Sequence, residues 1–229
     1  MLPRSFSRPF ISAAIACCSM AMPGAVTQTL FAADQPAAEL APGAVDTEAS
    51  RIYVRIGKRR LGHEHGAEGL LKSGTVHLNA RKDAGELVFD MSSFKADTDA
   101  ARNYVGLEGS TDQDEQSQVT ATMQGRRVLD AAAFPTATFE ITSAALLVEK
   151  TEEGDSQYLL DGELTLHGET KPVKVTAAVL EEKDGLVRLA GDFTIKQSDY
   201  GIKPYAAVGG LVAVTDELKI FGDLWIVKE

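Results

Sequence analysis

From Ser50 onward, apolar and polar residues alternate with a period of two. In the stretch GDFTIKQSDYGIKP (191–204), Phe193 and Ile195 share one face, and the alternation stops at the polar residues from Ser198 onward. A period of two is typical of β-strands with one buried face. The same alternation recurs in residues 52–56, 76–78, 87–91, 139–141, 164–166, 173–179, 187–195 and 218–226.

Short polar turns separate these runs and predict how the strands connect. Residues 83–85, 153–155, 167–169 and 183–185 each carry a glycine, which supplies the positive φ that tight turns require. Short connections join neighbouring antiparallel strands. We therefore expect an all-β fold, an eight-stranded antiparallel barrel that leaves no strand edge open. A sandwich of two sheets would give the same alternation.

Residues 112–133 lack the period of two. Val119 and Met123 fall at helical spacing, with acidic residues early and arginines late, as the helix dipole favours. Gly125 interrupts this pattern. We expect a short helical insert of one or two turns that ends before Phe134 and caps one end of the barrel.

The N-terminal segment resembles an export signal. Two arginines precede an apolar stretch, residues 10–22, that is too short to span a bilayer. We expect residues 1–33 to be a signal peptide and residues 34–49, rich in Ala and Pro, to be a disordered linker. Residues 50–229 would then form the folded domain of a periplasmic or secreted protein.

Both cysteines, Cys17 and Cys18, lie in this signal segment. After cleavage, the mature chain would have no thiol for a disulfide or a metal. Residues 14–17 loosely resemble a bacterial lipobox, and a lipid on Cys17 would tether the protein to a membrane. That alternative stays open.

The charge and the motifs narrow the function classes. The net charge of -10 makes the chain a poor candidate for binding nucleic acid or anionic lipid surfaces. The sequence has no nucleophile elbow, phosphate-binding loop or HExxH motif. We therefore expect a protein that is not an enzyme and needs no cofactor.

The motif GHEHG (62–66) is the sharpest candidate for metal chemistry. On a strand, His63 and His65 would face the same side, which suits a pair of imidazole ligands. A structural zinc usually takes four ligands, and the spacing brings neither His77 nor His167 near. We expect a structural or mouth-lining role and no metal site. A metal-binding protein or metal-dependent enzyme using His63 and His65 is the alternative.

Three segments carry a resemblance to a known family. FPTATFEITS (134–143), DGELTLHGETKPVKV (161–175) and FTIKQSDYGI (193–202), in this order, resemble the YceI-like family of bacterial periplasmic proteins. The resemblance runs from about Ser50 to the C-terminus. It implies a lipocalin-like barrel with a helical insert near one end. It also implies that the interior binds a polyisoprenoid or another amphiphilic lipid tail.

The apolar residues that point into the predicted barrel are then the candidates for contact with the lipid. The candidates are Phe89, Met91, Phe139, Leu164, Leu166, Phe193 and Ile195. Tyr200, in the polar turn, is a further candidate, although its ring is better suited to packing over a barrel end than to touching a ligand. The expected partner is an isoprenoid or fatty-chain lipid. A barrel with a filled core and a structural, stress-associated role would show the same pattern, and homodimerisation stays open.

Overall fold

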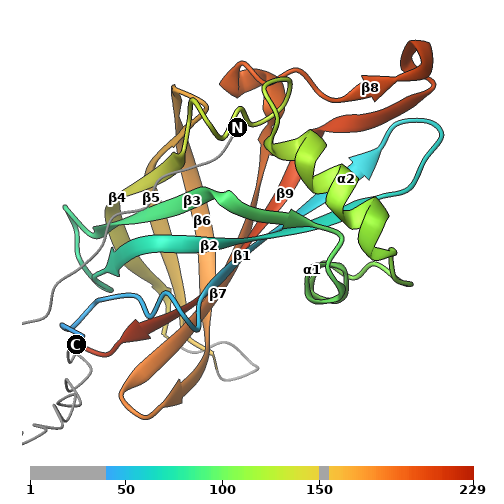
Figure 1. The fold of residues 1–229 in the computed structure, drawn as a ribbon. Helices are drawn as coiled ribbons and strands as arrows, with labels where there is room; N and C mark the ends of the chain where they lie inside the picture. The colour runs from blue at the N-terminus through green and yellow to red at the C-terminus, as the bar shows by residue number, and fades with distance from the viewer. Residues whose placement is uncertain (1–39, 150–154) are drawn as a thin grey trace, which may run out of the picture. The chain divides into compact units, whose positions relative to one another are not determined.

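The computed structural model describes residues 40–149 and 155–229 (Figure 1). Eight of its nine strands form a closed antiparallel barrel, in which β1 to β7 follow in chain order and β9 pairs with both β7 and β1. The strands are β1 (Arg51–Lys58), β2 (His65–Val76), β3 (Gly85–Ala96), β4 (Thr136–Val148), β5 (Gln157–Leu166), β6 (Glu169–Lys183), β7 (Leu186–Lys196), β8 (Ala206–Ala207) and β9 (Val212–Val227). The closure confirms the predicted barrel and excludes the sandwich.

The predicted turns have the backbone conformation that their sequences require. Asp83, His167 and Asp184 adopt φ values of 50°, 52° and 51°, and a glycine with positive φ follows two of them directly. Such turns match the right-handed twist of the strands that they join. The turn predicted at 153–155 lies, apart from its last residue, outside the described ranges.

The polar turn after β7 is a short 3-10 helix, η1 (Gln197–Tyr200). The Ser198 backbone N–H and hydroxyl both donate to the carboxylate of Asp216, at 2.9 Å and 2.6 Å. Gly201 then ends the helix with a φ of 69°. The regular strand stops here because side-chain and turn hydrogen bonds replace those of the sheet.

Strand β2 is longer than the sequence predicted, and it ends where a strand was expected to continue. The alternation placed a strand at residues 76–78, whereas β2 runs from His65 to Val76. Its pairing with β3 shifts register twice, between Glu68 and Leu70 and between Leu71 and Ser73. Each bulge changes the phase of the side chains, so no single alternation covers the strand.

A segment that precedes the predicted domain boundary at residue 50 is bonded to the barrel. On the N-terminal side of β1, residues 43–46 form backbone hydrogen bonds with the ends of both β2 and β9. The Val45 N–H donates to the carbonyl of Gly74, and the Val227 N–H donates to the carbonyl of Ala44. Val45 is buried against Ile226. These residues, expected in the linker, are therefore part of the fold; the signal segment lies outside the described residues.

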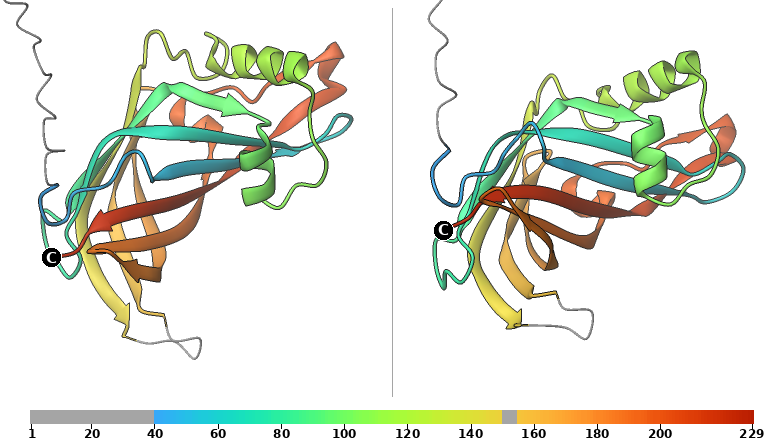
Figure 2. Two further views of the ribbon diagram at one scale, coloured as in Figure 1. Left: turned by 60° about the horizontal axis from the view of Figure 1, so that its bottom comes forward. Right: turned by 90° about the horizontal axis from the view of Figure 1, so that it is seen from below.

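Two helices connect β3 to β4. The sequence did not predict the six-residue α1 (Asp99–Tyr104), whose N-terminus is capped by the preceding Thr98: the Thr98 hydroxyl accepts from the Ala101 N–H. The predicted insert contains α2 (Gln113–Gln124), a single helix of 12 residues rather than one or two turns. It ends at Gly125, the residue that interrupts the helical pattern, well before the predicted end ahead of Phe134. In both views of Figure 2, α2 lies toward the end of the barrel that carries β8, and the C-terminus lies at the other end. Neither helix among the described residues is long and apolar enough to cross a membrane.

Helix α2 covers an edge that β4 leaves open. Strand β4 pairs with β3 only as far as Asp90, whereas β3 continues to Ala96. The Thr120 hydroxyl accepts from the Ala96 N–H at 2.9 Å, and the Gln124 amide donates to two further carbonyls of β3 at 2.8 Å and 2.9 Å. These side chains therefore take the place of the missing strand.

The close approach of β4 and β5 at Gly162 gives a test of the fold. A Cβ at Gly162 would collide with the carbonyl oxygen of Glu140. We expect Gly162→Ala to lower the free energy of unfolding by about 1–3 kcal/mol, as overpacking does. At Gly222 the same atom would lie 3.8 Å from its nearest neighbour, in ordinary contact, so Gly222→Ala is the matched control. Urea unfolding of both variants measures the difference; equal losses would contradict the described register.

Candidate functional site: an apolar cavity with a polar mouth

A cavity of about 430 Å³ lies inside the barrel. All eight barrel strands and α2 contribute to its wall, and most of the lining side chains are apolar. The volume falls within the range of small-molecule binding sites, which are mostly apolar with a few polar groups. The interior therefore keeps space that side chains do not fill.

The structure places most of the sequence-predicted wall residues around this space. The cavity is lined by Phe89, Met91, Phe139, Leu164, Leu166, Phe193 and Ile195. Tyr200 differs, because it is buried to 2% exposure and does not line the cavity. Burial raises the pKa of the Tyr200 phenol, and nearby Asp199 adds to this effect. Tyr200 thus packs beside the barrel interior without reaching the cavity.

Other lining positions were not nominated from the sequence. Val119 and Met123 of α2 face the cavity, and their helical spacing was the available signal. Gly191 and Gly222 line it as well, and their lack of side chains leaves room. A glycine carries no hydrophobic signal in a strand alternation, so the signal available at these two positions was their small size, which favours a cavity over a filled core.

The polar lining groups gather at the α2 end of the cavity. They are His65, Glu115, Gln118, Thr122, Gln197 and Tyr205. Toward the other end the wall is apolar and includes Ile52, Leu189 and Leu224. The cavity therefore has the polarity of an amphiphile, with a polar mouth and an apolar interior.

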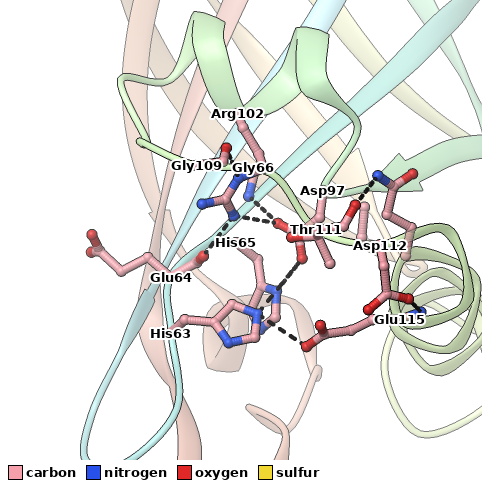
Figure 3. Close-up of polar contacts among 12 residues, drawn as sticks. His63, Glu64, His65, Gly66, Asp97, Arg102, Gly109, Thr111, Asp112 and Glu115 are labelled. Carbon is pink, nitrogen blue, oxygen red and sulfur yellow. Dashed lines mark hydrogen bonds and ion pairs between the residues drawn. The ribbon is translucent and has the colours of Figure 1, made fainter.

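A buried carboxylate organises this mouth (Figure 3). Asp97 directly follows β3, with a φ of 57° and a side chain that is 0% exposed. One carboxylate oxygen lies 2.6 Å from Nδ1 of His65. The other accepts from the Gly66 N–H at 3.1 Å and from the Arg102 guanidinium at 3.3 Å. Both oxygens are therefore paired.

These contacts fix the ionisation of Asp97 and the orientation of His65. Burial raises the pKa of Asp97, but the hydrogen bonds from His65 and Gly66 and the charges of His65 and Arg102 outweigh it, so the pKa lies below its usual value. An ionised carboxylate only accepts, so Nδ1 of His65 donates to it. In the neutral imidazole, Nε2 is then left as a hydrogen-bond acceptor.

The same cluster ties the connecting segments to the barrel. Arg102, on α1, also donates to the carbonyls of Glu108 and Gly109, in the loop before α2. His63 is 49% exposed, and its Nε2 lies 3.6 Å from a carboxylate oxygen of Glu115 in the first turn of α2. The cluster therefore joins the β1–β2 loop, β3, α1 and α2 at one end of the cavity.

Asp97 is a third potential metal ligand beside His63 and His65, and the sequence analysis did not place it near them. Donor atoms of His63, His65 and Asp97 lie within 4.8 Å of one another. However, 2.6 Å between His65 and Asp97 is a hydrogen-bond distance, shorter than the roughly 3.3 Å between neighbouring ligands of a tetrahedral zinc. A carboxylate that holds a histidine in this way orients its ring.

The fold and its cavity define a lipocalin-like β-barrel with a lid helix over a polar mouth. A model of the YceI-like domain matches residues 44–224, and the chain belongs to the YceI-like family. No match was found among curated proteins.

Solved structures share this fold. A polyisoprenoid binding domain from Saccharophagus degradans, implicated in plant cell wall breakdown, is 16% identical with a TM-score of 0.57, covering 82% of this chain and all 100% of that one. BcnA of Burkholderia cenocepacia is 17% identical with a TM-score of 0.52, covering 80% of this chain and 99% of that one. At these identities the likeness concerns the fold.

Replacing the buried carboxylate should change the pH dependence of stability. The pKa of Asp97 is lower in the folded than in the unfolded chain. The ionised carboxylate therefore adds to the free energy of unfolding above about pH 4, and this stabilisation is lost as the pH falls through the folded-state pKa. We expect Asp97→Asn to cost about 3 kcal/mol at neutral pH, since Arg102 loses its buried partner. The variant should also lose less further stability in acid.

Urea unfolding at several pH values between about 2 and 7 measures both effects. Asp161→Asn is the control, because Asp161 forms an exposed ion pair with Lys174 and should contribute at most about 1 kcal/mol. A wild type and an Asp97→Asn variant with parallel pH profiles would contradict the assignment.

We further expect the histidine pair not to hold a tight metal. Both oxygens of Asp97 already accept hydrogen bonds, which leaves His63 and His65 short of a full ligand set. Elemental analysis after dialysis without chelator should find less than one metal ion per chain. One zinc or iron per chain that is lost in His63→Ala would reverse this expectation.

Proposed function

We propose that the protein binds a long-chain amphiphilic lipid, of the polyisoprenoid class, inside the barrel and without a cofactor. The observation that carries the proposal is the cavity itself, which is apolar along its wall and polar only at the α2 end. The name of the Saccharophagus degradans neighbour, a polyisoprenoid binding domain, supports the same ligand class.

Burial of the lipid tail would supply most of the affinity. Each buried methylene contributes about 0.8 kcal/mol, so a dozen would contribute roughly 10 kcal/mol before the costs of association. The polar head would lie at the mouth, where Nε2 of His65 and the amide of Gln118 can hydrogen-bond to it. The apolar wall thus selects the tail, and the mouth sets its direction.

In this proposal the protein is a binding protein rather than an enzyme, and it acts in the periplasm or outside the cell. The N-terminal signal segment supports export. Cell fractionation that finds the full-length chain in the cytoplasm would contradict it. A tether through Cys17 and a homodimer are both compatible with this proposal.

Filling the cavity should separate binding from stability. We expect Leu164→Trp or Leu166→Trp to abolish binding of a radiolabelled long-chain isoprenoid alcohol, because the indole would occupy the space of the tail. The cost in unfolding free energy should fall below the roughly 1–3 kcal/mol typical of a close-packed core, because both side chains border empty volume.

Thr165→Trp is the matched control, because Thr165 lies between the two positions on the outer face, where its hydroxyl contacts that of Thr170 at 2.8 Å. The control should bind like the wild type. Folded tryptophan variants that still bind the alcohol would refute the proposed site. A wild type that binds no lipid, with both inward variants unfolded, would show instead that the interior is solid.

A further inference from the structure

Two neighbouring loops form an exposed apolar tip at the mouth end of the barrel. The tip consists of Leu61, in the β1–β2 loop, and Val208, Leu211 and Val212, in and beside the β8–β9 hairpin. Their exposed fractions are 64%, 71%, 47% and 36%. The Leu61 N–H donates to the carbonyl of Leu211 at 3.1 Å, so the two loops hold the tip together. Exposed apolar groups clustered in this way mark interaction sites.

The backbone of the hairpin presents these side chains to solvent. Val208 adopts a φ of 50°, and the helical turn η2 (Val208–Gly210) continues with two glycines at positive φ. A β-branched residue rarely takes this conformation, and strained residues of this kind cluster at functional sites. The segment 205–214 carries no charged residue.

Cations lie directly beside the tip. Lys58, Arg59 and Arg60 are all exposed and immediately precede Leu61, in a chain whose net charge is -10. Within the described residues, neither arginine forms an ion pair, although Arg59 is close enough to Asp216 to lower the pKa of that carboxyl, after the larger effect of the hydrogen bonds from Ser198. The local charge is therefore opposite to that of the whole chain.

We propose that the apolar tip and these three cations form a docking site for an anionic lipid bilayer. Apolar side chains flanked by basic residues suit the boundary between headgroups and acyl chains, and each cation near such a surface adds to the attraction. The net charge of the whole chain argued against binding to anionic membranes. Because salt screens distant charges, however, the charges at the point of contact determine the attraction to the membrane. A second copy of the chain is a poorer occupant, because two tips in contact would bring like positive charges together.

The position of the tip connects docking to the cavity. Tyr205 and Val214, which flank the β8–β9 hairpin, line the cavity at its polar end. In Figure 1 the β8–β9 hairpin and the β1–β2 loop lie on the same side of the barrel as α2. A docked protein would therefore hold the polar end of the cavity close to the membrane. Docking does not depend on the proposed isoprenoid ligand, because binding to vesicles is measured without that ligand.

Sedimentation with vesicles tests the site. Protein produced from the full chain is mixed with vesicles of phosphatidylcholine, with or without phosphatidylglycerol. We expect the wild type to bind the anionic vesicles more tightly and to lose binding as salt rises. Leu61→Ser with Val208→Ser should weaken binding roughly tenfold. Arg59→Gln with Arg60→Gln should weaken it by a similar factor and remove the preference for anionic lipid.

Leu147→Ser with Leu180→Ser is the matched control, because these leucines are 53% and 49% exposed at the opposite end of the barrel, among acidic residues. All variants share the same N-terminal segment, so their differences report the tip alone. The proposal is overturned if the wild type ignores anionic vesicles or if the control loses as much binding as the tip variants. It is also overturned if the tip variants change only the oligomeric state.

Discussion

The cavity depends on one constraint: the backbone N–H and C=O groups of β3 beyond Asp90 need hydrogen-bond partners that β4 does not supply. Strand β4 does not extend far enough to pair with them, and unpaired groups within the wall would be costly. Thr120 and Gln124 of α2 supply hydrogen bonds at this edge. The need to cover the edge therefore places α2 over the barrel end, where Val119 and Met123 become part of the cavity wall.

The Asp97 cluster secures the same end by electrostatics. Its buried carboxylate accepts from His65, from the Gly66 backbone and from Arg102, so that loops from different parts of the chain share one anchor. Such a network is stable only when every member is paired. In Figure 3 the cluster joins the β1–β2 loop to α1 and the first turn of α2, which explains how a polar mouth persists beside an apolar interior.

Local patterns predicted the parts of this structure that depend on local physics. The period of two identified the half-buried strands of an antiparallel all-β fold, without separating a barrel from a sandwich. The inward phase identified wall residues such as Phe139 and Leu164, because one face of each strand is buried. The turn at Ser198–Gly201 followed from residues that favour such a backbone.

The misses have physical reasons too. Strand β2 was misplaced because bulges beside its glycines break the alternation. The length of α2 was underestimated because it has no buried residue and hence little amphipathic signal. Asp97 was not linked to His65 because 32 residues separate them, and only the closed barrel brings them together.

The central claim is that the barrel interior is a binding site for an apolar chain rather than a filled core. The most direct measurement is native mass spectrometry of the wild-type protein purified from its own cells, followed by extraction of the bound material. A species heavier than the polypeptide that releases a long-chain lipid on unfolding is the expected result. A protein that carries only its polypeptide mass, and that takes up no lipid when isoprenoid alcohols or fatty chains are added, would contradict the account.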